Sequence, residues 1–161
     1  VLREVLKEIE PDFLRAETRA PEQLYFQAGE LYRARQGFYR LLKRASTRID
    51  IADPHLDPEV FDFLEALDPD RVVRLLTGIP KPLFVKQLHA LRGTQPGLEA
   101  RSNNQNHDRF VILDGAIAWH LGASINGLGK RACMISRVTN EAERANVVSD
   151  FELWWKGGAP L

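Results

Sequence analysis

Several features that mark particular classes of protein are scarce in this sequence. Among its 161 residues there is one cysteine, Cys133, which excludes an internal disulfide and any metal site built from several cysteines. Lysine plus arginine number 22, and aspartate plus glutamate also number 22, so only a local basic patch would attract nucleic acid. No hydrophobic run approaches the length of a membrane-spanning helix, and no secretory signal is visible. We therefore expect a cytoplasmic protein that does not engage a membrane.

The composition that remains is that of an ordinary globular domain. Hydrophobic residues make up 44% and charged residues 27%, and the length suits one domain with a core better than two. Because the chain opens at Val1 rather than methionine, we expect it to be part of a longer protein with an upstream domain. Residues 1–20 are expected to form a helix or linker from that upstream region, since the helical periodicity of "LREVLKEIE" stops at Pro11. The domain itself is then expected over residues 21–161.

Helical and strand-like patterns alternate along this domain. A helix is expected from about Pro21, because one face of it would gather the residues Leu31, Ala34, Phe38, Leu41, Leu42 and Ala45. Asp57 is placed to cap a second helix with Pro58 at its first position, and Gly93 to close a third. Strands are expected at residues 47–54, 71–78, 97–102, 109–115, 116–122 and 132–138, before a last helix at 140–155. This order predicts an α/β sandwich with a mixed β-sheet.

The stretch "NHDRFVILDG", residues 106–115, joins polar residues to one of these strands. Alternation predicts one face with His107, Arg109, Val111 and Leu113, and another with Asp108, Phe110, Ile112 and Asp114. A neutral imidazole can attack phosphorus or take a proton, and a guanidinium offers a planar fork of donors that matches phosphate oxygens. The start of this strand is therefore a candidate phosphate site. Asp114 would join it only through a bend or by anchoring the neighbouring turn.

These residues resemble a known family. "HDRFVILD" is similar to the signature of the phospholipase D superfamily, which is His-x-Lys followed by four residues and Asp; here His107, Arg109 and Asp114 stand at those positions. In that family a small-Ser-x-Asn element follows on the next strand, and "GASIN" supplies Ser124 and Asn126 as its nearest equivalents. The resemblance implies a phospholipase-D-like α/β/α sandwich with a mixed central β-sheet, present as one half-unit.

The resemblance extends over roughly residues 30 to 156. "HLGASINGLGKR" also resembles phospholipase-D-like domains attached to bacterial and phage regulatory or defence proteins, and a fainter similarity is to the non-catalytic C-terminal domain of proteins with an MIT domain. Active members of the superfamily use two histidines, one as nucleophile and one as general acid. Because this chain has a single motif, the resemblance implies a twofold homodimer that brings two copies of His107 together.

The function implied is a metal-independent phosphodiesterase, and a nuclease rather than a lipase. His107 would attack the phosphodiester to give a phosphohistidine, and a second copy of His107 would protonate the leaving oxygen. Arg109, Asn126 and Ser124 would neutralise the phosphoryl oxygens, and Asp114 would orient the site. This chemistry needs neither a cofactor nor a metal. The expected partners are a second copy of the chain, a nucleic acid or other phosphodiester, and the upstream domain.

The alternative is a degenerate phospholipase-D-like module that binds phosphate, nucleic acid or a partner protein and serves dimerisation or sensing. Two differences from the family favour it. Arg109 replaces lysine, and eight residues separate Asp114 from Ala123, about two more than the family pattern. A third interpretation is a purely structural dimerisation module.

Other polar residues keep two interpretations each. His120 is a structural histidine or a second acid, while Asp53, His55 and Asp57 are turn and cap residues or a ligand site beyond the end of a strand. "GLGKR" offers glycine amides and Lys130 to phosphate but lacks the full P-loop pattern. A run of basic residues is either the solvated face of a helix or a track that binds a phosphate backbone; it consists of Arg33, Arg35, Arg40, Lys43, Arg44 and Arg48.

Overall fold

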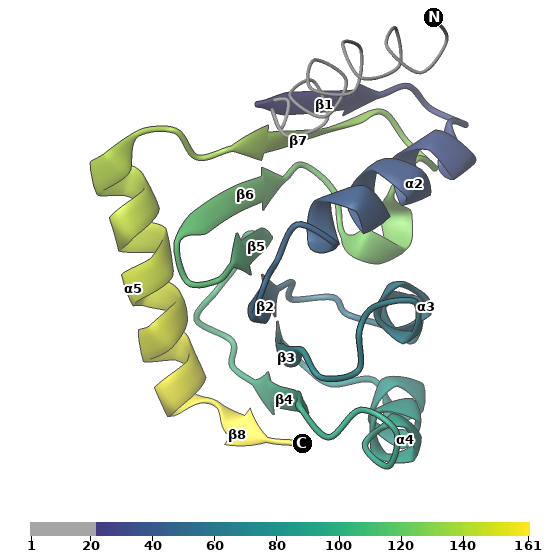
Figure 1. Cartoon of the computed structure of the whole chain (residues 1–161), viewed down its shortest axis with the longest axis vertical. Coiled ribbons are helices and arrows are strands. Elements are labelled where there is room, and N and C mark those ends of the chain that lie inside the picture. Colours follow the sequence, from purple (N-terminus) through teal and green to yellow (C-terminus); the bar gives the residue numbers. More distant parts are fainter. Residues whose placement is uncertain (1–21) are drawn as a thin grey trace, which may run out of the picture.

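An eight-stranded mixed β-sheet forms the centre of the computed structural model, which describes residues 22–161 (Figure 1). The strand order is β1-β7-β6-β5-β2-β3-β4-β8. β2, β3 and β4 run parallel to one another, and the other neighbouring strands pair antiparallel. The strands are β1 Gln23–Phe26, β2 Arg48–Ala52, β3 Val72–Thr77, β4 Leu98–Ser102, β5 Phe110–Leu113, β6 Ile117–Leu121, β7 Cys133–Arg137 and β8 Ala159–Pro160.

Helices cover both faces of this sheet. α2 (Leu31–Leu42), α3 (Glu59–Glu65) and α4 (Pro82–Leu91) pack on one face, and α5 (Glu141–Gly157) lies across the other (Figure 1). Each face has its own apolar core: the larger contains Phe38, Ile49, Ile51, Leu75, Val111 and Trp119, and the smaller, beneath α5, contains Ala52, Leu76, Ile112, Ala118, Phe151 and Trp155. The predicted α/β sandwich with a mixed sheet is confirmed.

Local sequence signals explain most of the boundaries. α3 begins at Glu59, one residue later than expected, and the Asp57 carboxylate accepts its N–H at 2.9 Å. Pro82 opens α4 at a position where its missing N–H costs no hydrogen bond. At the start of α5, the side chain of Asn140 accepts the Glu143 N–H at 3.0 Å. The predicted order of strands and helices from residue 47 onward is confirmed, with two unpredicted additions: a short 3-10 turn, η1 (Ile125–Gly127), after β6 and the two-residue strand β8 after α5.

The helix expected from about Pro21 is wrong over its first part. Residues Gln23–Phe26 form β1, which pairs antiparallel with β7, and α2 begins only at Leu31. The reason is tertiary, since β1 covers the backbone edge of β7 and buries Phe26 to 2% exposure. Gly29, at a φ of 88°, lets the chain turn between the two elements. The helix or linker expected at residues 1–20 lies outside the described residues.

One edge of the sheet collects most of the polar residues that the sequence singled out, Asp114 excepted. The parallel strands β2, β3 and β4 end there, β5 begins there, and β6 ends there, because Ala52 pairs with Phe110 and Phe110 with His120. We call this edge, with its loops at residues 53–58, 78–81, 103–109 and 122–131, the site edge. In open α/β sheets, ligands usually bind beyond the carboxyl ends of the parallel strands.

Candidate functional site

His107 and Arg109 lie in the segment that leads into β5 on the site edge. Within Phe110–Leu113 the predicted alternation is confirmed, since Val111 lies in the core beneath α2, α3 and α4 and Ile112 in the core beneath α5. The His107 side chain is exposed, and its imidazole makes no hydrogen bond to any described residue. Arg109 is half-buried, and its Nε is buried without a hydrogen-bond partner among the described residues. Both side chains thus retain hydrogen-bonding capacity for a ligand.

The loop that holds His107 is braced by residues that the sequence analysis did not single out for this role. Asn106, only 5% exposed, donates from its side chain to the Asp108 carbonyl at 2.7 Å and accepts the Asp108 N–H at 3.1 Å. Asp108 accepts the Arg109 N–H at 2.9 Å, and its Oδ1 lies 2.7 Å from His120 Nε2. The interpretation of His120 as a hydrogen-bonded structural histidine fits this contact. A short polar side chain directly before a candidate histidine is the signal that could have found Asn106.

Ser124 and Asn126 follow β6 on the site edge, but their side chains already donate hydrogen bonds within the protein. Ser124 Oγ donates to Asp53 Oδ2 at 2.7 Å, and Asn126 Nδ2 donates to Asp57 Oδ2 at 2.8 Å. Asn126 Nδ2 also lies 3.5 Å from the His55 carbonyl oxygen. A serine hydroxyl has one hydrogen to donate. In this structure both side chains therefore tie the loop after β6 to the loop after β2.

The loop after β2 is rigidly held from within. Asp53 is fully buried, and its carboxylate accepts the N–H groups of His55 and Ile125 at 2.9 Å each, in addition to Ser124. Lys81 Nζ lies 3.4 Å from the His55 carbonyl oxygen and 4.0 Å from Asp57 Oδ2. These contacts support the turn-and-cap interpretation of Asp53 and Asp57. Among residues 22–161 no group of three histidine, cysteine or acidic side chains could hold a metal ion.

Lys130 is exposed on the site edge, with its Nζ 3.9 Å from Glu59 Oε2. The neighbouring Gly129 has a φ of 78°, and its carbonyl accepts the Gly29 N–H at 2.9 Å. A Cβ at Gly129 would lie 2.8 Å from the Cα of Leu31, so this glycine is required where the loop packs on the start of α2. Packing against α2 thus explains Gly129, which the sequence analysis considered as a phosphate-binding glycine.

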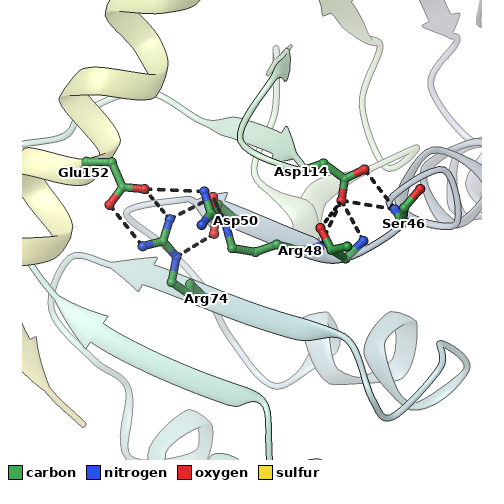
Figure 2. Close-up of polar contacts among 7 residues, drawn as sticks. Ser46, Arg48, Asp50, Arg74, Asp114 and Glu152 are labelled. Atoms are coloured by element: carbon green, nitrogen blue, oxygen red, sulfur yellow. Dashed lines mark hydrogen bonds and ion pairs between the residues drawn. The ribbon is translucent and has the colours of Figure 1, made fainter.

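Asp114 lies at the opposite end of β5 from His107. Its carboxylate accepts the backbone N–H groups of Ser46, Thr47 and Arg48 at 2.7–3.1 Å and the Thr47 hydroxyl at 2.9 Å (Figure 2). Desolvation tends to raise the pKa of Asp114, but these donors outweigh it and lower the pKa to about 2. The structure thus places Asp114 as an anchor of the turn before β2, at the far end of the strand from the candidate phosphate site.

An ion-pair network fixes α5 over the sheet. It consists of Arg48, Asp50, Arg74 and Glu152, and Figure 2 shows it reaching from α5 to the turn that Asp114 anchors. Asp50 is 1% exposed, and Arg74 binds its carboxylate at 2.7 and 2.9 Å and that of Glu152 at 2.6 and 3.1 Å. Hydrogen bonding to Arg74 lowers the pKa of Glu152. Burial opposes the charge on Arg74, but the two carboxylates outweigh it and raise its pKa.

Ion pairs also occupy part of the basic run that extends from α2 to the start of β2. Arg33 pairs with Glu30 at 3.1 Å, Arg35 pairs with Glu59 at 3.1 Å, and Arg48 belongs to the ion-pair network. These contacts favour the interpretation of the run as a solvated helix face, because paired guanidinium groups have less to offer a phosphate backbone.

Comparisons with known proteins concern the fold. No protein-family model matches the sequence, and no curated protein matches it. Among solved structures, the chain is similar to Nuc, a phospholipase D family member from Salmonella typhimurium, with a TM-score of 0.66 and 14% identity over 88% of this chain and 99% of that one. NucT from Helicobacter pylori gives a TM-score of 0.64 and 9% identity over 86% of this chain and 98% of that one.

A third similar structure is that of TrmBL2, an archaeal chromatin protein described with a novel mode of DNA binding. It gives a TM-score of 0.58 and 15% identity over 99% of this chain and 61% of that one. No helix among the described residues is both long and apolar enough to cross a membrane. The sheet order, the helices on its two faces and these structural matches together establish that residues 22–161 have the phospholipase-D-like fold.

Proposed function

We propose that this protein is a metal-independent phosphodiesterase, a nuclease, in which His107 is the nucleophile. The observation that carries the proposal is the position of His107 and Arg109, whose imidazole and guanidinium Nε have no described partner, on the site edge of a fold shared with the phospholipase D family member Nuc. An unpaired imidazole keeps a nitrogen lone pair for attack, and a guanidinium stabilises charge on phosphoryl oxygens. Such reaction chemistry requires no metal ion.

The reaction proceeds in two steps. In the first, an imidazole nitrogen of His107 forms a bond to phosphorus while the bond to the leaving oxygen breaks, and a protonated group gives that oxygen a proton. In the second, water attacks the phosphohistidine, the same group takes a proton from the water, and the P–N bond breaks to restore His107. Arg109 neutralises charge in both steps, with Lys130 as a further cation on the site edge, while Asp114 holds the far end of the strand in place.

A second proton-transfer group is therefore required. The sequence-based hypothesis takes it from a second copy of His107 in a twofold homodimer, and closed twofold dimers are the commonest oligomers. The similarity to TrmBL2, which is described as binding DNA, supports nucleic acid as the substrate class. The proposal includes a cytoplasmic setting.

A second candidate function is a module that binds phosphate or nucleic acid without cleaving it. It is favoured by the engagement of Ser124 with Asp53 and of Asn126 with Asp57, which leaves Arg109 to supply most of the donors for a phosphate. In this case the folded protein binds nucleic acid with a strong dependence on salt and turns nothing over.

The test is cleavage of labelled single- and double-stranded DNA and RNA, and of a chromogenic phosphodiester, in EDTA. We expect cleavage by the wild-type protein and none by His107→Ala, with the exposed helix residue His89→Ala as the matched control. Cleavage that survives His107→Ala would contradict the nucleophile. No cleavage by a folded wild-type protein that binds nucleic acid would establish the second candidate.

A further inference from the structure

His107 lies between two residues that are hydrogen-bonded to each other. The side chain of Asn106 donates to the Asp108 carbonyl at 2.7 Å and accepts the Asp108 N–H at 3.1 Å, so these hydrogen bonds close over the backbone of His107. Asn106 is only 5% exposed and is held by the protein around it. The direction in which the imidazole of His107 leaves the backbone therefore depends on how Asp108 is held.

Asp108 is held by a histidine of the neighbouring strand β6. Its Oδ1 lies 2.7 Å from Nε2 of His120 and also accepts the Arg109 N–H at 2.9 Å. One residue further along, the Arg109 carbonyl accepts the Leu121 N–H at 3.0 Å. The segment that carries His107 and Arg109 is thus joined to β6 twice, once through the backbone and once through the side chain of His120.

The imidazole of His120 is itself oriented by its surroundings. His120 pairs in register with Phe110, and the centroids of the two rings lie 5.6 Å apart. The side chains of His120 and Asp108 are 39% and 51% exposed, and polar contacts between side chains this exposed contribute little to the free energy of unfolding. The contact therefore matters less for the stability of the fold than for the position of Asp108.

The same contact distinguishes two roles for His120, one through Asp108 and one as a second acid. A carboxylate can only accept hydrogen bonds, so the hydrogen between the two groups belongs to Nε2 of His120. A general acid must instead give its hydrogen to the leaving oxygen. Because Nε2 already donates to Asp108, the geometry favours the role through Asp108.

We propose that His120 is a positioning residue for the nucleophile, and that through Asp108 it fixes the segment that carries His107. The inference rests on the proposed function and deepens it. Attack on phosphorus requires the reacting nitrogen to be aligned with the leaving oxygen, and a misplacement of about 1 Å can lower the rate about 100-fold. His120 touches no substrate and transfers no proton. It limits the directions open to His107 before the reaction begins.

The first test separates positioning from acid catalysis by the leaving group. We expect His120→Ala to lower the single-turnover rate of cleavage by roughly 10- to 100-fold, with substrate affinity and melting temperature near those of the wild type. The loss should be equal for DNA and for bis(p-nitrophenyl) phosphate, since both need the nucleophile. His120→Gln, whose amide nitrogen can replace Nε2 as the donor, should regain most of the rate, and His89→Ala should behave as wild type. An unchanged rate in His120→Ala, or a loss confined to DNA, would overturn the inference.

The second test asks whether His120 acts through Asp108. Single-turnover rates of His120→Ala, Asp108→Ala and the double variant form a double-mutant cycle. Because both substitutions break the same contact, we expect the double variant to be no slower than Asp108→Ala alone. Losses that multiply would overturn the inference while leaving the proposed function standing. Absence of cleavage by the wild type, or its survival in His107→Ala, would instead overturn the proposed function and the inference with it.

Discussion

The polar side chains at the two ends of β5 differ in how fully they are hydrogen-bonded. At the end where Asp114 lies, one carboxylate receives three backbone N–H groups and a hydroxyl, and the turn it holds leads through Arg48 into the ion-pair network under α5 (Figure 2). At the other end, His107 and the Arg109 Nε have no partner among the described residues. Stability is concentrated where polar groups are satisfied, and reactivity requires groups that are not. β5 thus connects the turn that Asp114 anchors to the unpaired groups on the site edge.

The largest effect on activity is expected from His107→Ala, at the unpaired end of β5. We expect cleavage of nucleic acid to fall to background, because no other group replaces the nucleophile. The melting temperature should stay close to that of the wild type, since the side chain is exposed and a surface substitution changes stability by about 0.5 kcal/mol or less. Cleavage assays beside thermal denaturation measure both, and a large loss of stability would mean that this end of β5 is also structural.

The largest effect on stability is expected at the anchored end. Arg74→Ala leaves Asp50, which is 1% exposed, with Arg48 as its one remaining charged partner. Removal of one partner from a buried ion pair costs about 3–5 kcal/mol in the free energy of unfolding. Urea denaturation measures this loss. Arg33→Ala, which removes an exposed pair, is the control and should cost about 1 kcal/mol or less. Equal effects of the two variants would argue against a buried network.

Asp114→Ala should give a smaller loss that depends on pH. By comparison with carboxylates that cap helices, we expect a cost of about 1 kcal/mol at neutral pH. The folded-state pKa is lowered to about 2 from an ordinary 3.8, so this stabilisation is fully present above pH 3.8 and is lost as the pH falls toward 2. Urea denaturation of wild type and variant across that range should show the two stabilities converging at low pH. A difference that does not shrink between pH 4 and pH 2 would contradict the proposed anchoring.

The smallest effect is expected for the binding of nucleic acid by Arg109→Ala. Loss of one phosphate contact should reduce the slope of log K against log salt concentration by about one, with affinity weakened across all sequences alike. Fluorescence anisotropy with DNA at several salt concentrations measures the slope. Lys86→Ala, on α4, removes the same charge from another surface and should leave the slope unchanged. An unchanged slope in Arg109→Ala would place the phosphate elsewhere.

Much of the fold was accessible to prediction because local signals agreed with it. Alternation in "RFVILD" correctly separated Val111 from Ile112, since a strand between two helical layers presents its side chains to both. The prediction for the first segment failed because its local helical pattern conflicts with the tertiary structure. The pattern of α2 extends plausibly back to Pro21, but burial of Phe26 and the open edge of β7 make a strand of Gln23–Phe26. Propensity within a segment carries no information about a neighbouring edge.

The sequence by itself determined the α/β class, the order of strands from residue 47 and the start of β5 as a candidate phosphate site, because these depend on periodicity and spacing. Only the tertiary structure decided what surrounds each residue. It paired Ser124 with Asp53 and Asn126 with Asp57, sent Asp114 to the far end of β5, and brought the loops of His55 and His107 together over Gly78. Those contacts join residues about 25 to 75 positions apart, and strand register, which no local pattern contains, sets them.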